Sequence, residues 1–543
     1  MKKLRIAMAQ INPVVGDIGG NLQKIISWNT IAREQYQADL VIFPEMVLTG
    51  YPINDLLFNK EFWRQLREAL RTIKAKAGSG YMILGLPICK SKQYFNATVL
   101  FHGGKMVAIY SKHILFHGHS IDERRYFTPG QQPVSFRLKG VKVALSMDED
   151  ILLDKRGKAV IGGTPDLLLS LGATPFIADK MLLYGKVLAT YARRQRCGVI
   201  QVNLVGGQDD LIFAGGSVVF DADGTLVQRA PFFKEELLVL DWPHLKSSCD
   251  RDAVTLPIDE PKKIELIYGA LVLGVKDYVL KNGFEQVVVS VSGGIDSALT
   301  LAIAVDALGK ERVKTYYLPS RFSSRLSKTI VNQQAKFLDV VNSTISIEPL
   351  FKQYLAVLAG QLVKPLNSIT LANLQARCRA SIIMTLANDH CAMVITTNNK
   401  SETAVGYTTL YGDMVGGFAH LKDVTKTLVY ELAHYRNSIS IAIPQAAIER
   451  IPTAELAKNQ RDDDDLPPYP VLDEIIVRLV ALGQTEEQLS GAGFDKNMVR
   501  EVAKMIGYSE YKRRQAPLGP KITTAAFGSD SYYPVTSKFK YGG

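Results

Sequence analysis

A strand that passes through two adjacent glycines directly into a helix constrains this chain more than any other feature of its sequence. Within VVVSVSGGIDSALTLAIA, the apolar strand runs into Ser292, and an apolar helix follows. Gly293 and Gly294 allow the backbone to approach a phosphate, and a helix N-terminus favours anions. Ser292 and Ser297 offer hydroxyl donors, while Asp296 offers a hard oxygen ligand for Mg2+. A serine-capped turn is the alternative, but this hexapeptide between a strand and a helix favours phosphate binding.

The sequence on both sides of this loop alternates between strand and helix patterns. Residues 264–283 are apolar at helical spacing and end at a glycine, which is typical of a helix with a C-cap. Apolar segments separated by helical sequence then follow: QVVVSV, VKTYYLP, STISIEP and AMVITT. Strands that are apolar on both faces are typical of a buried parallel sheet. This half is therefore predicted to be a doubly wound α/β domain.

The first half has a different rhythm and predicts a second domain. Up to about residue 240, helical segments alternate with short apolar runs such as LRIAMAQ, DLVIFPE, YMILGLP, KVALSM and VIQVNLV. Near its end, SVVFDADGTLVQRA has an Asp-Gly turn between apolar runs and predicts a hairpin. Residues 246–263 are polar, contain two prolines and lack periodicity. We therefore predict domains at 1–245 and 264–543, joined by this linker.

Composition limits the function classes. The chain of 543 residues is 47% hydrophobic and 22% charged, as in globular proteins. Its net charge of +11 comes without basic blocks that interleave aromatic residues, which favours phosphorylated small molecules over nucleic acid. The five scattered cysteines lack a CxxC pair and predict buried free thiols rather than disulfides or zinc. Without a signal peptide or an apolar stretch of about 18 residues, we expect a soluble, cytoplasmic protein with no membrane partner.

Longer motifs extend the argument. The hexapeptide resembles the loop of the N-type ATP pyrophosphatases, which split ATP into AMP and pyrophosphate to adenylate a substrate oxygen. It lacks the GK[ST] ending of a Walker loop, so γ-phosphate transfer is not expected. The block ITTNNKSETAVGYTTLYGDMVGGFAHLKDVTKT resembles NAD+ synthetases, particularly the long glutamine-dependent type, and TISIEP, NLQAR, LPPYPVLD and KRRQAPLGPKITTAAFGSDSYYPVTSKF also match. The resemblance implies ATP-dependent amidation of nicotinic acid adenine dinucleotide to NAD+, in a family that is commonly oligomeric.

The same resemblance implies roles for individual residues. Asp296 and Glu402 correspond to the carboxylates that hold Mg2+ and ATP. Asp413 corresponds to the residue that faces the nicotinate ring and the incoming ammonia, and Lys426 to the lysine near the adenylate. The other implied nucleotide-binding residues are Ser292, Gly293, Gly294, Ser297, Arg377, Thr397 and Lys400, with Ser401 on the same loop.

Two positions depart from the motifs of this half. Asn398 stands where a glycine is usual in TTGNKSE, and we expect it to crowd the nucleotide or to adopt a left-handed backbone, which asparagine tolerates. Ala457 replaces a basic residue of AELRP. Neither change removes an implied metal ligand, so synthetase activity stays the favoured outcome.

The first half resembles nitrilase-type amidase domains, whose fold is an αββα sandwich. FPEMVLTGYP supplies Glu45, which corresponds to the general base, and YSKHILFHGHSIDERRYFTPG supplies Lys112, which corresponds to the oxyanion partner. The nucleophilic cysteine of the family's CED motif is replaced by Asp148 in KVALSMDEDI. A carboxylate is far less nucleophilic than a thiolate, so we predict a folded amidase domain without glutamine hydrolysis.

Further departures accompany Asp148. His117 and Gly118 replace the Asn and Tyr of LPNYGVFDE, and Leu152 replaces the tryptophan that usually follows CED. A second carboxylate beside Glu45 is expected to raise the pKa of one of the two groups. Lys112 is expected to pair with both of them.

Three functions remain open from the sequence. The first is an NAD+ synthetase that uses ATP, Mg2+ and free ammonia. The second is an enzyme that hydrolyses glutamine by a route other than the missing cysteine. The third is a non-catalytic descendant that binds a nucleotide and has a regulatory or assembly role.

Overall fold

The computed structural model describes residues 3–76, 78, 80–118, 120–152, 163–242, 261–361, 365–458 and 460–538. The chain divides into two compact units, Met1–Leu266 (unit 1) and Ile267–Gly543 (unit 2). Most of the predicted linker lies outside the described residues, and its end leads into helix α5 (Lys263–Lys281). This helix matches the one expected over 264–283.

Unit 1 contains two six-stranded sheets, and the first has the order β14-β1-β2-β3-β4-β5. β1 lies next to the edge strand β14, with which it pairs in antiparallel orientation, and it pairs with β2 in parallel. Its strands are β1 (Leu4–Gln10), β2 (Leu40–Ile42), β3 (Tyr81–Lys90), β4 (Gln93–His102), β5 (Lys105–Ser111) and β14 (Glu236–Trp242). Two helices, α1 (Ile18–Glu34) and α2 (Lys60–Lys76), belong to the same half of the unit.

The second sheet has the order β13-β12-β9-β8-β7-β6. Its strands are β6 (Ser135–Leu138), β7 (Val141–Met147), β8 (Leu167–Gly172), β9 (Gly198–Asn203), β12 (Val218–Phe220) and β13 (Leu226–Arg229). The short α3 (Asp148–Leu152) follows β7 directly, and α4 (Ala178–Gln195) packs against β9 and β12. The antiparallel pair β12 and β13 confirms the predicted hairpin. A separate pair, β10 (Val205–Gln208) and β11 (Leu211–Ala214), completes the unit.

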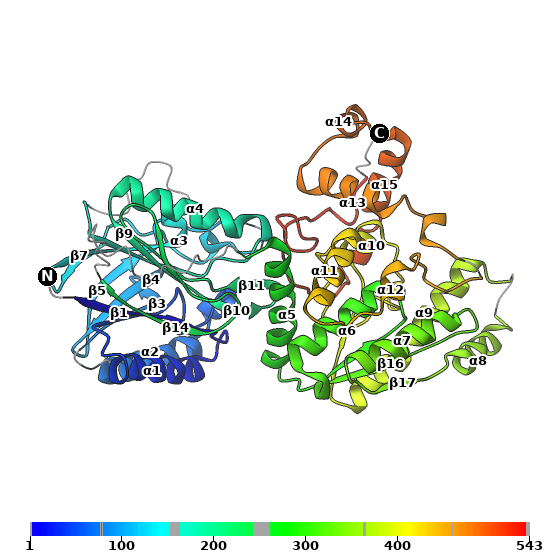
Figure 1. The fold of residues 1–543 in the computed structure, drawn as a ribbon, viewed down its shortest axis with the longest axis horizontal. Helices are drawn as coiled ribbons and strands as arrows, with labels where there is room; N and C mark the ends of the chain where they lie inside the picture. Colours follow the sequence, from blue (N-terminus) through cyan, green and yellow to red (C-terminus); the bar gives the residue numbers. More distant parts are fainter. Residues whose placement is uncertain are drawn as a thin grey trace. The chain divides into compact units, whose positions relative to one another are not determined.

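The alternation of side chains along β1 explains the layers of unit 1. Leu4, Ile6 and Met8 point into the core between the two sheets, where they join residues of β7, β8 and β9. Ala7 and Ala9 point to the other face and pack in the cluster that includes residues of α1 and α2. Figure 1 shows α1 and α2 outside one sheet and α4 outside the other. The αββα sandwich expected from the nitrilase resemblance is confirmed.

Unit 2 is built on a four-stranded sheet in which every pair is parallel, with the order β17-β16-β15-β18. The strands are β15 (Val287–Ser290), β16 (Val313–Tyr317), β17 (Asn342–Thr344) and β18 (Met393–Ile395). They alternate with α6 (Ile295–Leu308), α7 (Arg325–Phe337), α8 (Glu348–Leu358) and α9 (Ser368–Asp389). The strand order reverses between β15 and β18, and doubly wound sheets bind ligands at such a point. The predicted doubly wound sheet is confirmed.

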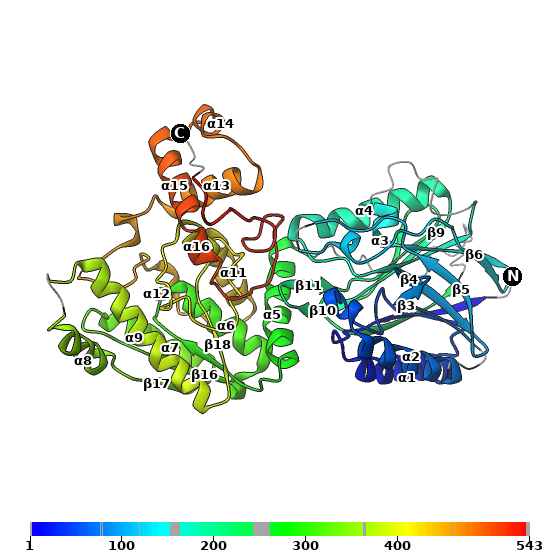
Figure 2. The same cartoon turned by 180° about the vertical axis from the view of Figure 1, so that it is seen from behind.

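The remaining helices of unit 2 complete the site and add a small helical cluster. They are α10 (Lys400–Val405), α11 (Lys426–Ile439), α12 (Gln445–Glu449), α13 (Tyr469–Ile476), α14 (Glu486–Gly491), α15 (Lys496–Tyr508) and α16 (Glu510–Arg513). Leu472, Ile476 and Val502 share a core in which α13, α14 and α15 pack with residues of α10. Figures 1 and 2 both show α13, α14 and α15 gathered together.

The structure bears on the expectations for the cysteines and for membrane-spanning helices. Cys197 and Cys378 are buried as expected, but Cys89 and Cys391 are exposed, so the prediction of buried thiols is wrong for these two. Cys249 lies outside the described residues. In the part of the chain that the structure describes, no helix combines the length and apolarity needed to cross a membrane.

Candidate functional site

A cavity of about 620 Å3 lies in unit 2, where the strand order reverses. Two loops at the carboxyl ends of neighbouring strands supply much of its lining, which includes Ser292, Gly294, Asp296 and Ser297 after β15 and Thr396, Thr397 and Asn398 after β18. Because parallel strands end at the same edge of a sheet, segments about 100 residues apart in the chain meet here.

Hydroxyl groups close the glycine loop onto the first turn of α6. Ser292 Oγ lies 3.1 Å from Ser297 Oγ and accepts the backbone N–H of Gly294 at 3.2 Å. Gly293 has a φ of +83°, and a Cβ there would lie 2.9 Å from the carbonyl oxygen of Ser327. The backbone conformation and the close contact therefore both require glycine at this position.

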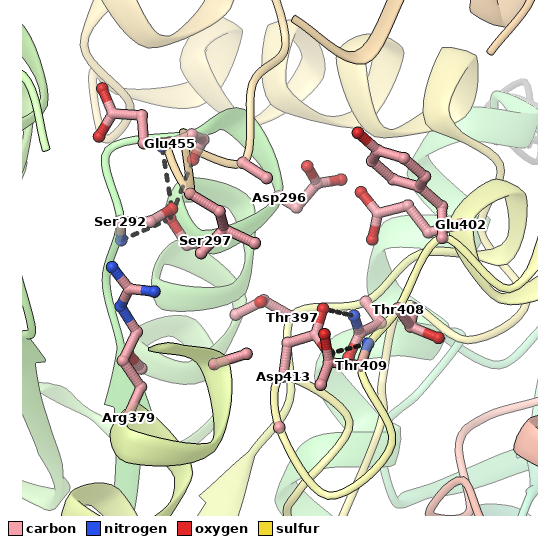
Figure 3. Close-up of a pocket in the computed structure, with 18 of the residues that line it drawn as sticks. Ser292, Asp296, Ser297, Arg379, Thr397, Glu402, Thr408, Thr409, Asp413 and Glu455 are labelled. Carbon is pink, nitrogen blue, oxygen red and sulfur yellow. Dashed lines mark hydrogen bonds between the residues drawn. The ribbon is translucent and has the colours of Figure 1, made fainter. Parts of the chain in front are cut away.

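Two carboxylates converge on one lysine beside this loop. Lys426 Nζ lies 2.5 Å from Asp296 Oδ2 and 3.7 Å from Glu402 Oε1. Asn399 Nδ2 donates to the other oxygen of Asp296 at 2.9 Å. Figure 3 shows the carboxylates of Asp296 and Glu402 facing the same space. Three residues from separate parts of the sequence thus form one charged cluster.

Burial sets the charge balance of this cluster. It raises the pKa of Glu402 to about 8, with a further contribution from the nearby charge of Asp296. Burial opposes the charged form of Lys426, but Asp296 and Glu402 outweigh this effect and raise the pKa of the ammonium group. The cluster holds two carboxylates against one ammonium group, so it has capacity for another cation.

The donor set fits a metal ion that arrives with phosphates. Mg2+ prefers one or two protein carboxylates together with phosphate oxygens and water, and Asp296 and Glu402 supply that number. Among the described residues, no group of three or more His, Cys, Asp or Glu side chains is arranged to hold a metal by itself. A site completed by the nucleotide is the arrangement that these residues allow.

Asp413 occupies another part of the same cavity. Its Oδ1 accepts the backbone N–H of Thr409 at 2.6 Å, and Asn398 Nδ2 lies 3.5 Å from its Oδ2. The side chain is accessible, yet the surrounding protein disfavours its charge and raises its pKa. Asn398 does not have a positive φ, so the expected left-handed backbone is wrong. The asparagine instead directs its side chain to Asp413.

On α9, the arginine that lines the cavity is Arg379, whereas the predicted Arg377 is not among the lining residues. Arg377 is exposed and donates from Nε to the carbonyl oxygen of Leu410 at 3.2 Å, and it does not belong to the cavity lining. The lining residues of α9 include Ala372, Ala376, Arg379 and Ile383, which recur at helical spacing. Residues two apart on a helix point in different directions. Helical phase in NLQARCR is therefore the signal that would have selected Arg379.

Glu455 is another lining residue that the sequence analysis missed. It accepts hydrogen bonds from the backbone N–H of Ser324, from Ser327 Oγ and from Arg450. Arg450 lines the cavity too. These residues come from α7 and from the segment after α12, and no local motif connects them. Ala457, two residues after Glu455, is not among the lining residues.

Lys400 and Ser401 support the site from behind the cavity. The buried Lys400 Nζ donates to Asp423 Oδ1 at 2.7 Å, to Thr523 Oγ1 at 3.0 Å and to the carbonyl oxygen of Ala525 at 3.0 Å. Ser401 Oγ donates to Asp473 and accepts the backbone N–H of Lys426 at 2.9 Å. Lys400 is not among the residues that line the cavity, and its contact with nucleotide stays a prediction.

Unit 1 contains a second buried polar cluster, centred on Lys112. The Lys112 ammonium group lies 3.0 Å from Glu45, 2.9 Å from Glu123 and 2.5 Å from Glu149. Asn96 Nδ2 donates to Glu45 at 2.5 Å and to Glu123 at 2.7 Å. The sequence analysis predicted Glu45 and Lys112 but missed Glu123, whose place in the cluster follows from a loop that returns to β4.

Asp148 forms its hydrogen bonds with residues outside this cluster. Its carboxylate accepts hydrogen bonds from Thr174 Oγ1, from Gln201 Nε2 at 3.0 Å and from Ser170 Oγ at 3.4 Å. It also packs so closely over Gly172 that a Cβ there would collide with it. The expected pairing of Lys112 with both Glu45 and Asp148 is therefore wrong, because Glu149 takes the place expected for Asp148.

The carboxylates of this cluster outnumber its single cation. Burial raises the pKa of Glu45 to about 8 and that of Glu149 to about 7, while Lys112 opposes both shifts. Burial also raises the pKa of Asp148, against the hydrogen bonds that it accepts. Asp150 accepts the backbone N–H groups of His113 and Ile114 at 3.1 Å and 2.7 Å, which fixes the chain just after Lys112.

Comparisons with known proteins agree with this division of the chain. The family described as NAD synthase matches residues 267–516, and the family described as carbon-nitrogen hydrolase matches residues 5–157. The glutamine-dependent NAD(+) synthetase of Aquifex aeolicus is 40% identical, with 99% of this chain and 100% of that protein covered. The enzyme of the same name from Xanthomonas campestris is 40% identical, with 99% and 98% covered.

A solved structure shows the same similarity in three dimensions. The glutamine-dependent NAD+ synthetase from Acinetobacter baumannii, in complex with adenosine diphosphate, is 35% identical to this chain. The match covers all of both chains with a TM-score of 0.78. Identity at this level over the full length places the chain with these proteins: it belongs to the glutamine-dependent NAD+ synthetase family.

Proposed function

We propose that this chain makes NAD+ from nicotinic acid adenine dinucleotide, ATP and ammonia through an adenylated intermediate. The observation that carries the proposal is the convergence of Asp296, Glu402 and Lys426 beside the Ser292–Ser297 loop. A carboxylate does not accept an amine unless it is activated, and a nucleotide site with paired acidic and basic groups suits that activation.

Two steps account for the reaction. A carboxylate oxygen of the nicotinic acid bonds to the α-phosphorus of ATP, and pyrophosphate leaves with the electrons of the broken P–O bond. The ammonia nitrogen then bonds to the acyl carbon, AMP leaves with the electrons of the C–O bond, and the nitrogen loses one proton. Lys426 offsets the charge of the departing pyrophosphate, and Asp413 lies where the ammonia enters.

Asp296 and Glu402 would hold Mg2+, which when bound neutralises phosphate charge. Thr397 and Asn398 lie on the loop after β18 in the same cavity, and Arg379 adds a cation to its lining. Burial lowers the pKa of Arg379, while the charge of Glu455 opposes this shift. Of these residues, Thr397 and Arg379 bind and orient the nucleotide.

We also propose that unit 1 does not hydrolyse glutamine. Nucleophilic attack on an amide needs a group that presents its lone pair to the substrate. The carboxylate oxygens of Asp148 instead accept hydrogen bonds from Thr174, Gln201 and Ser170. The ammonia therefore comes from solution.

The experiment follows pyrophosphate and NAD+ with ATP, Mg2+, the dinucleotide and ammonium present. The wild-type chain is expected to release both, while Asp296→Asn and Glu402→Gln reduce pyrophosphate release by about 100-fold or more. Asp339→Asn is the matched control, because Asp339 is a carboxylate of unit 2 that pairs with Lys310 at the surface. Nucleotide binding without any pyrophosphate release would contradict the proposal and favour a non-catalytic role.

A further inference from the structure

Asn398 leaves a buried hydrogen-bond acceptor unused in the cavity. Its side chain is 8% exposed and belongs to the cavity lining. The Nδ2 group faces Asp413 Oδ2 at 3.5 Å. Oδ1 is buried and accepts no hydrogen bond from any residue that the structure describes. Buried acceptors are normally satisfied, so this oxygen points to a ligand that donates.

The chemistry of Asp413 determines which end of the amide is free. A carboxylate only accepts hydrogen bonds, so the NH2 group of Asn398 has to face it. The backbone N–H of Thr409 already occupies the other oxygen of Asp413 at 2.6 Å. Asn398 Oδ1 and Asp413 Oδ2 are therefore two acceptors close together, and a ligand between them has to bring at least two donors.

We propose that Asn398 Oδ1 and Asp413 Oδ2 bind the incoming ammonia, and that Asn398 sets the affinity of this chain for it. The proposal rests on the synthetase function proposed above. Ammonia carries three N–H groups, so two can be donated to these oxygens while the lone pair stays available. When that lone pair bonds to the acyl carbon, the acyl C–O bond breaks, AMP keeps its electrons, and Asp413 accepts the proton that the nitrogen loses.

The replacement of the cysteine in unit 1 supports the same role for Asn398. The motif that this loop resembles has a glycine at position 398, which offers no side-chain acceptor. In this chain the asparagine occurs together with Asp148 in place of the amidase cysteine. An enzyme that takes ammonia from solution gains from a second acceptor at the point of entry, because binding then compensates for dilute ammonia.

The test compares Asn398→Gly and Asn398→Ala with the wild-type chain in steady-state NAD+ synthesis. Losing one hydrogen bond is expected to raise the KM for ammonium by about threefold to tenfold in both variants. The KM values for ATP and dinucleotide, and kcat at saturating ammonium, are expected to stay within about twofold of wild type. Pyrophosphate release in the first step, measured without ammonium, is expected to be unchanged.

Thr396→Val is the matched control. Thr396 lies two residues earlier on the same loop, and its buried hydroxyl also has no partner among the described residues, but no hydrogen bond links it to Asp413. Its ammonium KM is expected to equal that of wild type. An unchanged ammonium KM in both Asn398 variants, or a parallel rise in all three KM values, would overturn the proposal. If the wild-type chain forms no NAD+, this result would instead contradict the proposed function itself.

Discussion

Glu149 illustrates how one buried residue couples stability to pH. Lys112 neutralises only one of the three carboxylates within hydrogen-bonding distance of it. The folded chain therefore holds protons that the unfolded chain releases at lower pH. A carboxyl whose pKa rises on folding stabilises the fold at low pH, and this contribution is lost as pH rises through the folded-state value.

Glu149→Gln is expected to make unit 1 less sensitive to alkaline pH. The pKa of Glu149 rises from 4.5 to about 7, so the wild type loses stability between about pH 5 and pH 8, and the variant lacks this loss. The change in unfolding free energy over that range should shrink by up to about 3 kcal/mol. All three tryptophans, Trp28, Trp63 and Trp242, lie in unit 1, so urea unfolding followed by tryptophan fluorescence reports on it.

The exposed Glu68→Gln serves as its control. Glu68 pairs with Arg64 on the surface of α2, where an ion pair contributes little. This variant should retain the pH dependence of the wild type. If Glu149→Gln also retains it, Glu149 is already ionised near its ordinary pKa in the folded chain.

Asp148→Cys tests the missing nucleophile at the same scale. The thiol would lie at the start of α3, close to Glu45 and Lys112, but we expect only weak glutaminase activity. At position 118, a Cβ would lie 2.9 Å from the Phe116 ring, so the tyrosine of the related motif has no space unless that ring moves. A displacement of about 1 Å can reduce a rate by about 100-fold.

The measurement is ammonia release from glutamine by wild type, by Asp148→Cys, and by the double variant with Gly118→Tyr. Asp148→Asn is the isosteric control and should remain inactive. The double variant should exceed the single one if Phe116 can rearrange. Release by the wild type at the rate of the cysteine variant would refute the inactive amidase.

At the scale of elements, hydrogen bonds to Asp423 connect the N-terminus of α10 to the C-terminal part of the chain. Asp423 accepts Lys400 Nζ, the backbone N–H groups of Ile522 and Thr523 at 2.8 Å each, and Thr523 Oγ1 at 2.9 Å. The carboxylate thereby joins segments about 100 residues apart. These hydrogen bonds position α10, which carries Glu402.

Lys400→Met is expected to remove the connection between α10 and Asp423. Removing one partner leaves Asp423 buried without its counter-charge, which costs about 3–5 kcal/mol. Urea unfolding followed by circular dichroism measures the loss, and hydrogen exchange at Ile522 and Thr523 shows whether it is local. Lys310→Met removes an exposed lysine that pairs with Asp339 and should cost less than about 1 kcal/mol. Equal stability of the two variants would contradict the structural role of Lys400.

For the whole molecule, the two units differ in their expected activity. Unit 2 combines a ligand cavity with a cluster suited to nucleotide chemistry. Unit 1 retains the fold and the buried Glu45 and Lys112 of an amidase, but its aspartate at position 148 faces elsewhere. Under the proposal, unit 1 keeps its fold without hydrolysing glutamine, because packing and catalysis depend on different residues.

The wild-type chain is accordingly expected to prefer ammonium over glutamine by a large factor. With glutamine as the nitrogen source and ammonium kept low, NAD+ formation should stay near background, because no nucleophile replaces the cysteine. The synthetase from Acinetobacter baumannii, tested in parallel, controls for the glutamine assay. Equal rates with both nitrogen sources would show that unit 1 hydrolyses glutamine by another route.

Features that depend on neighbours in the chain can be predicted from the amino-acid sequence. The Ser292–Ser297 loop, the parallel strands around it and the β12–β13 hairpin follow from local patterns of apolar residues, glycines and turns. Asp296 and Glu402 could be predicted as partners because long motifs carry them in register. Asp148 is predicted to replace the family's cysteine for the same reason.

Which side chains meet depends on how distant segments of the chain pack. The phase of α9 brings Arg379 rather than Arg377 to the cavity. Lys400 donates to Asp423 behind the cavity, and Asp148 accepts hydrogen bonds from Thr174, Gln201 and Ser170 instead of pairing with Lys112. A side chain's direction depends on helix phase and on the donors that distant segments supply. Those quantities arise only once the whole chain has packed.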